Sequence, residues 1–464
     1  MIKMDFSWLA AVLKTSYNGE NLAVANINTD TRTIESGEVF LALKGPNFDG
    51  HRFLEVAKAR GAIAAIVSCP DEDIDLVQFV VDDTRIALGQ IGKAVIDTVA
   101  PKTIAITGSV GKTTVKEMCA AILAQKGKVL ATKGNFNNDI GVPLTLLRLT
   151  EEDQYAVVEL GANHLGEIAY TTALVSPDVA TVCNVAPAHI EGFGSIDGVG
   201  KAKGEIFSGL KVNGVAVINA DSDYAAMWQE NLTVTNVKRY SLHEQLDIWV
   251  DEVALDELAR PTFKLCRDNQ SVRVSLPLSG QHNVSNALIA AALTTELGAS
   301  LEEVATGLAQ MAEVKGRVNM IQVSDTLRVV DDTYNANVKS VNAAIDLLAS
   351  MSGYKVLALG DMAELGEGAR EYHKEVGEYA KQQGIDELFS LGVLSSSASN
   401  VFEKPNRHFS TRESLMKALK VVLAEQSGRC TVIVKGSRSA RMELLVEELV
   451  NAGQSDNETG EVTC

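Results

Sequence analysis

The sequence has no excess of positive charge. It holds 42 lysine and arginine residues against 60 aspartate and glutamate residues, which gives a formal net charge of -18. A protein that wraps nucleic acid needs a basic surface to displace the counterions of the phosphates, so we expect no nucleic-acid partner. A single bound nucleotide is not excluded, because a glycine-rich loop, one lysine and a divalent cation can hold a triphosphate whatever the net charge.

The sequence also lacks paired cysteines and long apolar runs. The six cysteines are scattered without a CxxC pair, so the sequence indicates neither a zinc site nor a disulfide framework and favours reduced thiols at Cys69, Cys119, Cys183, Cys266, Cys430 and Cys464. No run approaches the roughly 20 apolar residues that span a bilayer. Residues 1–13 lack the basic region and long apolar core of a secretory signal. We therefore expect a cytoplasmic protein without membrane insertion.

What the chain does hold is enough apolar side chain for several cores. Its 46% hydrophobic and 22% charged residues are the mix of a folded protein. A chain of 464 residues is too long for one ordinary core. We find no internal repeat or low-complexity segment. The sequence predicts three α/β domains at 1–98, 99–314 and 315–452, followed by a flexible polar tail at 453–464.

Short apolar runs are expected to form the strands of these domains. In the first domain they lie at 39–43 and 63–67. In the other two they alternate with helical periodicity, which is typical of a parallel sheet covered by helices. The second domain is expected to have strands at 103–106, 128–131, 155–159, 179–184 and 215–219 and a helix at 115–125. The third is expected to be Rossmann-like, with strands at 327–330, 355–359, 387–391 and 431–434 and a helix at 340–349.

The segment TGSVGKTT at 107–114 joins an expected strand to an expected helix. Backbone N–H groups and the positive end of a helix can together cradle phosphate oxygens at such a turn. Lys112 is placed for the β and γ phosphates, and Thr113 offers a hydroxyl to Mg²⁺. A merely structural glycine turn is the alternative, and the GKT sequence between a strand and a helix argues against it. We expect the whole turn to bind ATP, through Gly108, Ser109, Val110, Gly111, Lys112, Thr113 and Thr114.

This phosphate-binding loop departs from the usual pattern. The motif G-x-x-x-x-G-K-[ST] requires its first glycine where this chain has Ile106. No base-reading motif of a GTPase follows downstream. The departure argues against a general P-loop ATPase or GTPase.

Metal ligands are expected at the ends of neighbouring strands. Glu159 ends one expected strand, and His189 follows another, so both lie at the phosphate edge of the sheet. Taken alone, each could be an ordinary polar side chain, and for a lone histidine that interpretation is the better one, but their common position beside the phosphate edge favours both as ligands. His164 is better explained as a structural or substrate-orienting residue. Lys201 and Lys203, by composition alone, are typical of a solvated helix face.

Five segments together resemble the Mur ligase family, and the likeness covers nearly the whole chain. They are TGSVGKTT at 107–114, VELGAN at 158–163, GQHNVSNA at 280–287, DDTYNAN at 331–337 and LGDMAELG at 359–366. The last two are similar to the member that adds D-alanyl-D-alanine. The resemblance implies a first domain that holds a uridine nucleotide, a central ATPase domain with a mostly parallel sheet, and a third domain that brings in the dipeptide.

Nucleotide and metal residues follow from the same resemblance. It implies that Thr113, Glu159 and His189 bind Mg²⁺, and that Lys203 is carbamylated to bridge magnesium. The residues with catalytic roles would be Lys112, Lys203 and His189. The adenine would be faced by Asn283 and Asn286. Arg317 and Asp332 would reach the nucleotide from the third domain when the domains close.

Substrate residues are implied in the first and third domains. The uridine segment would include Thr31, Arg32, Lys44, Gly45, Asp49, Gly50 and His51. The peptide region would include Asn335, Asn337, Lys435, Ser437 and Arg438. For the segment KGSR at 435–438, an exposed basic turn is about as consistent with the sequence as a direct contact with the peptide.

The implied reaction joins D-alanyl-D-alanine to UDP-N-acetylmuramoyl-tripeptide, with ATP and Mg²⁺, for peptidoglycan synthesis. We expect the tripeptide carboxylate to be activated as an acyl phosphate, which the dipeptide amine displaces, by a monomeric enzyme. One alternative is a ligase of the same superfamily that extends folate with glutamate. Another is a regulatory protein that uses ATP as a switch. The third residue of the tripeptide, lysine or diaminopimelate, stays open.

Overall fold

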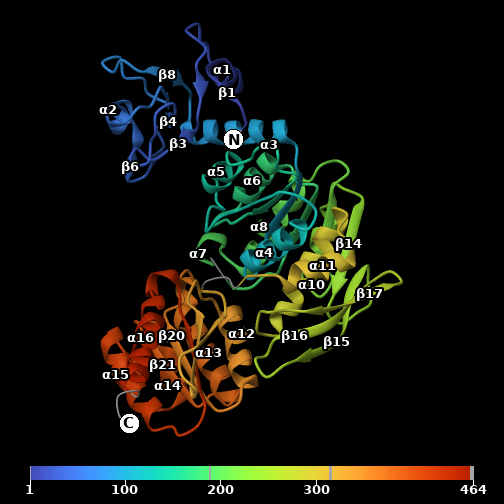
Figure 1. The fold of residues 1–464 in the computed structure, drawn as a ribbon, viewed down its shortest axis with the longest axis vertical. Helices are drawn as coiled ribbons and strands as arrows, with labels where there is room; N and C mark the ends of the chain where they lie inside the picture. Colours follow the sequence, from blue (N-terminus) through green and yellow to red (C-terminus); the bar gives the residue numbers. More distant parts are fainter. Residues whose placement is uncertain (1, 188–189, 313–315, 460–464) are drawn as a thin grey trace.

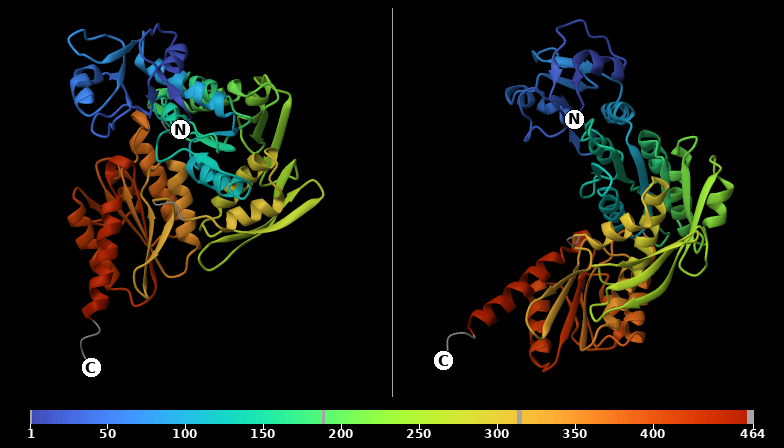
Figure 2. Two further views of the ribbon diagram at one scale, coloured as in Figure 1. Left: turned by 45° about the horizontal axis from the view of Figure 1, so that its top comes forward. Right: turned by 45° about the vertical axis from the view of Figure 1, so that its right-hand side comes forward.

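The computed structural model describes residues 2–187, 190–312 and 316–459. Three parts follow one another along the long axis of the molecule, in sequence order (Figure 1). The first and second parts lie against each other through helix α3 (Thr84–Val99), and the third lies beyond the central part (Figure 2). This arrangement confirms the predicted α/β fold with three domains.

The first domain is built on a four-stranded parallel sheet in the order β3-β4-β7-β8. The strands expected at 39–43 and 63–67 are β4 and β7, each shorter than expected. Two small antiparallel pairs, β1-β2 and β5-β6, flank this sheet. The elements are β1 (Met4–Asp5), α1 (Phe6–Leu13), β2 (Ala23–Val24), β3 (Ile27–Asn28), β4 (Val39–Leu41), β5 (Lys44–Gly45), β6 (Phe48–Asp49), η1 (Gly50–Phe53), α2 (Leu54–Ala59), β7 (Ala64–Val67) and β8 (Val77–Val80).

The central domain has a nine-stranded sheet in the order β10-β11-β9-β12-β13-β14-β15-β16-β17. Strands β10 to β15 are parallel, and the last two pairs are antiparallel. Its strands are β9 (Lys102–Thr107), β10 (Val129–Ala131), β11 (Tyr155–Glu159), β12 (Val179–Val182), β13 (Val215–Asn219), β14 (Asn236–Ser241), β15 (Ile248–Leu255), β16 (Pro261–Arg267) and β17 (Gln270–Ser275).

Helices cover the two faces of this sheet. They are α4 (Lys112–Leu123), α5 (Gly141–Leu146), α6 (Glu167–Val175), α7 (Ile190–Phe193), α8 (Ile196–Gly204), η2 (Glu205–Gly209), α9 (Ala225–Glu230), α10 (His282–Glu296) and α11 (Leu301–Ala309). Five strands and helix α4 lie where the sequence predicts them. Strands β14 to β17 are not predicted, because charged side chains break their apolar runs and leave only a weak alternation.

The third domain has a six-stranded sheet in the order β18-β19-β23-β20-β21-β22, which is parallel except for β18. The four expected strands are β19, β20, β21 and β23, and the expected helix is α12. The elements are β18 (Asn319–Gln322), β19 (Leu327–Asp332), α12 (Val338–Ser350), β20 (Tyr354–Gly360), η3 (Gly366–Gly368), α13 (Ala369–Gln382), β21 (Glu387–Leu391), α14 (Ser396–Phe402), β22 (His408–Phe409), α15 (Arg412–Ala424), β23 (Cys430–Lys435), η4 (Arg438–Ala440) and α16 (Glu443–Thr459).

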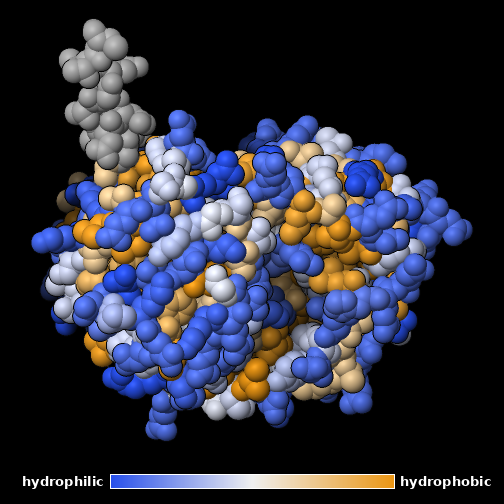
Figure 3. Space-filling view, turned by 90° about the horizontal axis from the view of Figure 1, so that it is seen from below, coloured by the Kyte–Doolittle hydropathy of each residue, from blue (hydrophilic) through white to orange (hydrophobic). Residues whose placement is uncertain are grey.

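Helix α16 differs from the expected end of the domain. A flexible tail is expected from 453, yet the helix continues to Thr459. A helix that is already nucleated adds residues at little cost, and no proline stops this one. Within the described ranges, no helix combines the length and apolarity needed to cross a membrane. The face of the molecule seen in Figure 3 is mainly hydrophilic, with a hollow near its middle.

Candidate active site

The phosphate-binding loop connects β9 to α4 and depends on two glycines. Gly108 has a φ of +149° and Gly111 a φ of +84°, which is backbone that other residues rarely adopt. A Cβ on Gly111 would lie 2.6 Å from Asn286 Oδ1, and a Cβ on Gly108 would lie 2.9 Å from the Cβ of Cys183. Both positions therefore require glycine for conformation and for space.

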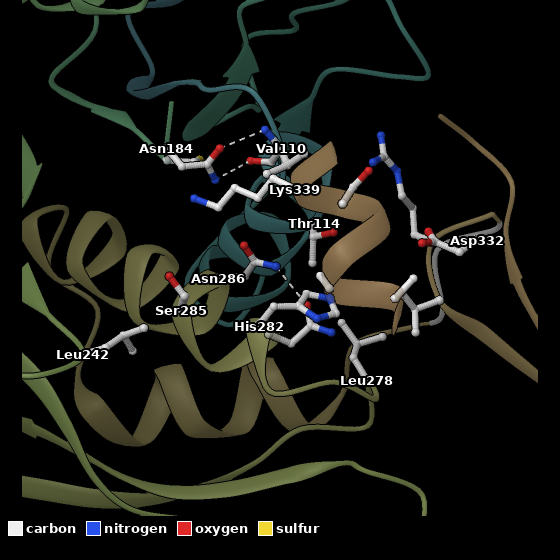
Figure 4. Close-up of a pocket in the computed structure, with 18 of the residues that line it drawn as sticks. Val110, Thr114, Asn184, Leu242, Leu278, His282, Ser285, Asn286, Asp332 and Lys339 are labelled. Atoms are coloured by element: carbon white, nitrogen blue, oxygen red, sulfur yellow. Dashed lines mark hydrogen bonds between the residues drawn. The ribbon is translucent and has the colours of Figure 1, made fainter. Parts of the chain in front are cut away.

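Asn184, just after β12, clamps this loop. Its Oδ1 accepts a hydrogen bond from Val110 N at 3.0 Å, and its Nδ2 donates to Val110 O at 2.9 Å (Figure 4). Its carbonyl oxygen also accepts from Ser109 N at 3.0 Å. Sequence reasoning did not select Asn184, although its position at the end of an expected strand was a usable signal. The clamp holds the loop in shape before a nucleotide binds.

Lys112 opens helix α4 and reaches back over the loop. Its Nζ donates a hydrogen bond to Gly108 O at 2.8 Å. Burial lowers the pKa of Lys112, while the nearby Glu159 carboxylate acts in the opposite direction. The lysine and the N-terminal N–H groups of α4 therefore meet at one point, which suits the terminal phosphates of a nucleotide.

Thr113 and Glu159 form an oxygen-rich corner beside Lys112. The Thr113 hydroxyl donates to Glu159 Oε2 at 2.9 Å, and Asn137 Nδ2 donates to Glu159 Oε1 at 2.8 Å. Glu159 is only 3% exposed. Hydroxyl and carboxylate oxygens are the donors that Mg²⁺ prefers, so these residues fit that ion. His189, the other expected metal ligand, lies outside the described residues.

Lys203 is buried, contrary to what composition alone indicated. It lies on α8 with 2% of its surface exposed, and its Nζ is 5.6 Å from the centroid of the Phe193 ring. Burial lowers the pKa of Lys203 to about 7, and the charge of Lys112 adds to the shift. The solvated-face interpretation holds for Lys201, which is exposed. The tertiary fold therefore separates two lysines that the sequence treats alike.

A cavity of about 380 Å³ lies between the central and third domains. Asn286 Nδ2 donates to Asn283 Oδ1 at 2.9 Å, and both asparagines line this cavity with Gly111. From the third domain, Arg317 and Asp332 complete the wall, and their contact with a nucleotide stays a prediction. Further polar side chains that sequence reasoning did not select also line it: Asp221, His243, His282 and Lys339 (Figure 4 labels the last two). The cavity's place beside the phosphate-binding loop suits a nucleotide.

A second cavity, of about 680 Å³, lies on the other side of the same loop. Lys112, Glu159 and Lys203 line it from the central domain, and Asn335 and Arg438 line it from the third domain. The two cavities share four lining residues: Val110, Gly111, Arg317 and Ser340. They therefore meet where the terminal phosphates of a bound nucleotide would lie.

Arg317 bridges the two domains at this meeting point. Its Nη2 donates to Thr113 Oγ1 at 3.4 Å, and its guanidinium lies 4.0 Å from the centroid of the Tyr334 ring. The Nε of Arg317 is buried and has no hydrogen-bond partner among the described residues. A buried donor without a partner is costly, so this group is poised to bind something that enters the site.

The expected peptide residues of the third domain have different surroundings. Lys435 is buried and pairs with Asp332 Oδ2 at 2.5 Å, on the side of the smaller cavity. The side chain of Asn337 caps helix α12, and Ser437 is buried. Arg438 is 71% exposed and pairs with Glu443 at 3.4 Å, at the larger cavity. Of the charged residues in KGSR, only Arg438 therefore faces the space that a peptide would occupy.

The expected uridine residues lie in the first domain and line neither cavity. His51 Nδ1 donates to Asp49 Oδ1 at 2.7 Å, and His51 Nε2 accepts from Ser68 N at 2.9 Å, so both ring nitrogens serve the fold. Gly50 is buried, and a Cβ there would lie 2.8 Å from Leu43 O. The other residues of this set remain at least partly exposed: Thr31, Arg32, Lys44, Gly45, Asp49 and His51.

One charged pair of this segment also has a clear local role. Arg32 Nη2 lies 2.6 Å from Asp30 Oδ2, and this hydrogen bond lowers the pKa of Asp30 to about 2. The pair lies at the surface, so it contributes little to stability.

The fold and the site define a three-domain, P-loop, nucleotide-binding enzyme whose third domain completes the site. Family models match along the chain: the Mur ligase family, catalytic domain at 23–126, the Mur ligase middle domain at 106–294, and the Mur ligase, glutamate ligase domain at 316–438. The chain belongs to the Mur ligase family, which confirms the resemblance found in its motifs.

Relatives and solved structures agree with this assignment. The chain is 48% identical to the UDP-N-acetylmuramoyl-tripeptide--D-alanyl-D-alanine ligase of Escherichia coli, over 98% of this chain and 100% of the relative. It is 34% identical to the Bacillus subtilis ligase of the same name, over 97% and 99%. MurF from Acinetobacter baumannii aligns with a TM-score of 0.91 and 38% identity, over 97% of this chain and 99% of that one.

Two further structures bear on nucleotide binding and on the alternatives. MurF from Thermotoga maritima, solved in complex with ADP, aligns with a TM-score of 0.84 and 26% identity, over 93% of this chain and 98% of that one. Folylpolyglutamate synthase of Mycobacterium tuberculosis has a TM-score of 0.61 and 16% identity, over 81% and 96%. The latter likeness shows a shared fold alone.

Proposed function

We propose that this enzyme joins D-alanyl-D-alanine to UDP-N-acetylmuramoyl-tripeptide at the expense of ATP. The observation that carries the proposal is the meeting of two cavities at the phosphate-binding loop. The smaller cavity has the amides and the loop that suit a nucleotide. The larger one has Lys112 and Glu159 at one side and Arg438 at the other. An acid and an amine can therefore meet next to the γ phosphate.

The reaction proceeds in two transfers. The terminal carboxylate of the tripeptide attacks the γ phosphorus, the bond to the β-phosphate oxygen breaks, and an acyl phosphate and ADP form. The dipeptide amine then attacks the acyl carbon, and the tetrahedral intermediate expels inorganic phosphate as the amine loses a proton. Lys112 and Arg317 offset the negative charge of the transferred group, because catalysis of phosphoryl transfer is mainly positioning and electrostatics.

Thr113 and Glu159 are the residues that would hold magnesium, together with His189. The ion would neutralise phosphate charge and orient the γ phosphate. The support is chemical: a hydroxyl and a carboxylate oxygen lie 2.9 Å apart beside the phosphate-binding loop. Asn137 holds the second carboxylate oxygen and so fixes the orientation of Glu159.

Lys203 is proposed to carry a carbamate. Only the neutral amine of a lysine can attack carbon dioxide to form the N–C bond, with loss of a proton. A pKa of about 7 leaves a large neutral fraction at neutral pH, whereas an ordinary lysine has very little. The resulting negative charge would lie at the cavity wall shared with Glu159 and Lys112, where it suits a bridging role toward magnesium.

Substrate placement and cell compartment complete the proposal. The exposed residues of the uridine segment would hold the UDP part of the acceptor, while Asn335 and Arg438 would face the peptide and dipeptide. We further propose that the enzyme acts as a monomer. Five free cysteines, at positions 69, 119, 183, 266 and 430, support a reducing compartment such as the cytoplasm.

One substrate experiment tests the activity. Purified protein is incubated with ATP, Mg²⁺, the UDP-tripeptide and radiolabelled D-alanyl-D-alanine, and the nucleotide-linked products are separated. We expect a labelled UDP-pentapeptide and one phosphate released per bond. Labelled glutamate incorporated in place of the dipeptide would move the chain to another ligase of the superfamily. ATP hydrolysis that is equal with and without the peptide substrates would favour the regulatory alternative.

A further inference from the structure

Lys116 is a buried lysine that the proposed reaction does not use. It lies on α4 one turn after Lys112, and only 1% of its surface is exposed. A buried ammonium group costs free energy unless it is well hydrogen-bonded, whereas methionine would fill the same space without that cost. The position therefore points to a role that an apolar side chain cannot perform.

The ammonium group of Lys116 holds the end of strand β10. Its Nζ donates to Thr132 O at 2.6 Å and pairs with Glu117 Oε1 at 2.7 Å. Thr132 directly follows β10, the three-residue strand at the edge of the central sheet. Arg148 Nη1 donates to the preceding carbonyl, Ala131 O, at 3.3 Å. Two cations thus fix the end of a strand that has few ladder hydrogen bonds of its own.

Thr132 in turn fixes the backbone of Glu159. The Thr132 hydroxyl oxygen accepts a hydrogen bond from Glu159 N at 3.0 Å, and Thr132 N donates to Val157 O at 3.1 Å. Glu159 then accepts from the Thr113 hydroxyl, which returns to helix α4. The hydrogen bonds form a closed circuit from α4 through the ends of two strands and back to α4.

We propose that Lys116 is a positioning residue for the magnesium site. It acts through Thr132, whose hydroxyl sets the backbone of Glu159 and so the distance between the Glu159 carboxylate and the Thr113 hydroxyl. This inference rests on the proposed function, because Thr113 and Glu159 are proposed metal ligands. A group that hydrogen-bonds to a metal ligand without touching the metal should affect the affinity for metal more than the affinity for the nucleotide.

Lys116→Met tests this role, because it keeps the apolar stem and removes the donor. The readout is Mn²⁺ binding to the ADP complex, followed by electron paramagnetic resonance. We expect affinity for Mn²⁺ to fall about 10-fold, with unchanged affinity for ADP in the absence of metal, measured by calorimetry. Lys126→Met is the matched control, because Lys126 follows the same helix but pairs with Glu303, at 3.2 Å. It should bind Mn²⁺ as the unaltered protein does.

Thr132→Val is a second, independent test of the same circuit. It removes the hydroxyl that accepts from Glu159 N and changes the shape of the side chain little. We expect a similar loss of Mn²⁺ affinity, and the double variant with Lys116→Met should lose little more than either single variant. Residues that act through one chain of contacts are non-additive in this way. This variant also gives an answer if Lys116→Met does not fold.

The outcomes separate the inference from the proposed function. Glu159→Gln should weaken Mn²⁺ binding. If it does not, the proposed metal site fails, and the inference fails with it. If Glu159→Gln weakens binding while Lys116→Met and Thr132→Val bind Mn²⁺ normally, the inference alone is overturned. Equal losses of metal-free ADP binding and Mn²⁺ binding in Lys116→Met would show a general structural role and would also overturn it.

Discussion

The two interfaces between neighbouring domains of this protein, called seams below, differ in polarity. Between the first and central domains, one apolar cluster is continuous: Leu88 and Ile91 of α3 belong to the same buried core as Val142 and Leu146 of the central domain. A Cβ on Gly92 of α3 would lie 3.0 Å from Pro143 Cα, so the helices are in close contact. The seam between the central and third domains instead holds two cavities lined by charged and amide groups.

The difference indicates which seam is fixed and which can move. Separating the first two domains would expose a shared core, and apolar burial makes that costly. The other seam encloses the two cavities, and the buried core of the third domain includes only Ala259 from the described residues of the central domain, so the third domain can rotate at a lower cost. An enzyme that admits a nucleotide, a peptide acid and an amine needs such a movable seam, because its site must open for substrates and close to exclude water.

The sharpest test of the polar seam is Lys112→Ala. Removing this cation leaves the charge of the transferred phosphate without its main partner, so turnover should fall by at least about 100-fold. Lys112 is not part of an apolar core, so the thermal unfolding midpoint should change little. Phosphate release with both peptide substrates present, together with calorimetry, measures the two effects. Normal turnover in this variant would remove the loop from the mechanism.

The apolar seam should respond in the opposite way. Leu88→Ala deletes a fully buried side chain from the shared core, so the free energy of unfolding should fall by about 2–5 kcal/mol. No residue of α3 lines either cavity, so kcat per folded molecule should stay close to normal. Urea unfolding and an assay at low temperature measure these quantities. A large loss of kcat without a loss of stability would contradict the proposal that the apolar seam supports stability and the polar seam supports catalysis.

Arg317→Ala should show how much the third domain contributes to catalysis. The variant loses the guanidinium beside Thr113 and the cation–π contact with Tyr334. We expect kcat/KM for ATP to fall about 10- to 100-fold, in line with the loss of one charged donor. Arg317→Lys should recover only part of it, because lysine lacks the planar fork. Lower kcat/KM values with an unchanged circular dichroism spectrum would support a catalytic contribution of Arg317. Normal kinetics in both variants would contradict that contribution.

A pH dependence of stability is also expected, from Lys203. Its pKa in the folded protein is about 7, below the ordinary value of 10.5. Between these values the unfolded chain binds more protons, so this lysine makes stability rise as pH increases from about 7 to 10.5. Below about pH 7 its penalty is fully present. In buffer free of carbon dioxide, where the Lys203 amine stays unmodified, Lys203→Met should remove that rise in urea unfolding, while Lys201→Met, at an exposed site, should keep it.

Several parts of the site were readable from the sequence because they depend on local patterns. The phosphate-binding loop needs a strand, two glycines, a lysine and a helix start in immediate succession, and the structure has each in place. Glu159 was selected because it ends an apolar run, and the end of a parallel strand lies at the edge where ligands bind. The asparagines of α10 came from the family resemblance, and both line the smaller cavity.

Other features depend on contacts between segments far apart in the chain. Asn184 bonds to Val110 across 74 positions, and Lys116 on α4 reaches Thr132, just after β10, across 16 positions. Strands β14 to β17 complete the central sheet through partners, with only a weak pattern of their own. In each case the stabilising interaction is made with a partner segment, and the local sequence does not identify that partner.

The sequence by itself determined the order of the elements, the phosphate-binding turn and the family, because hydrophobic period and glycine placement act within a few residues. Only the tertiary structure decided which of two nearby lysines is buried, which seam is apolar, and where the two cavities meet. Burial and electrostatic coupling arise when distant segments pack together and exclude the water between them. A local sequence pattern cannot predict which segments will do so.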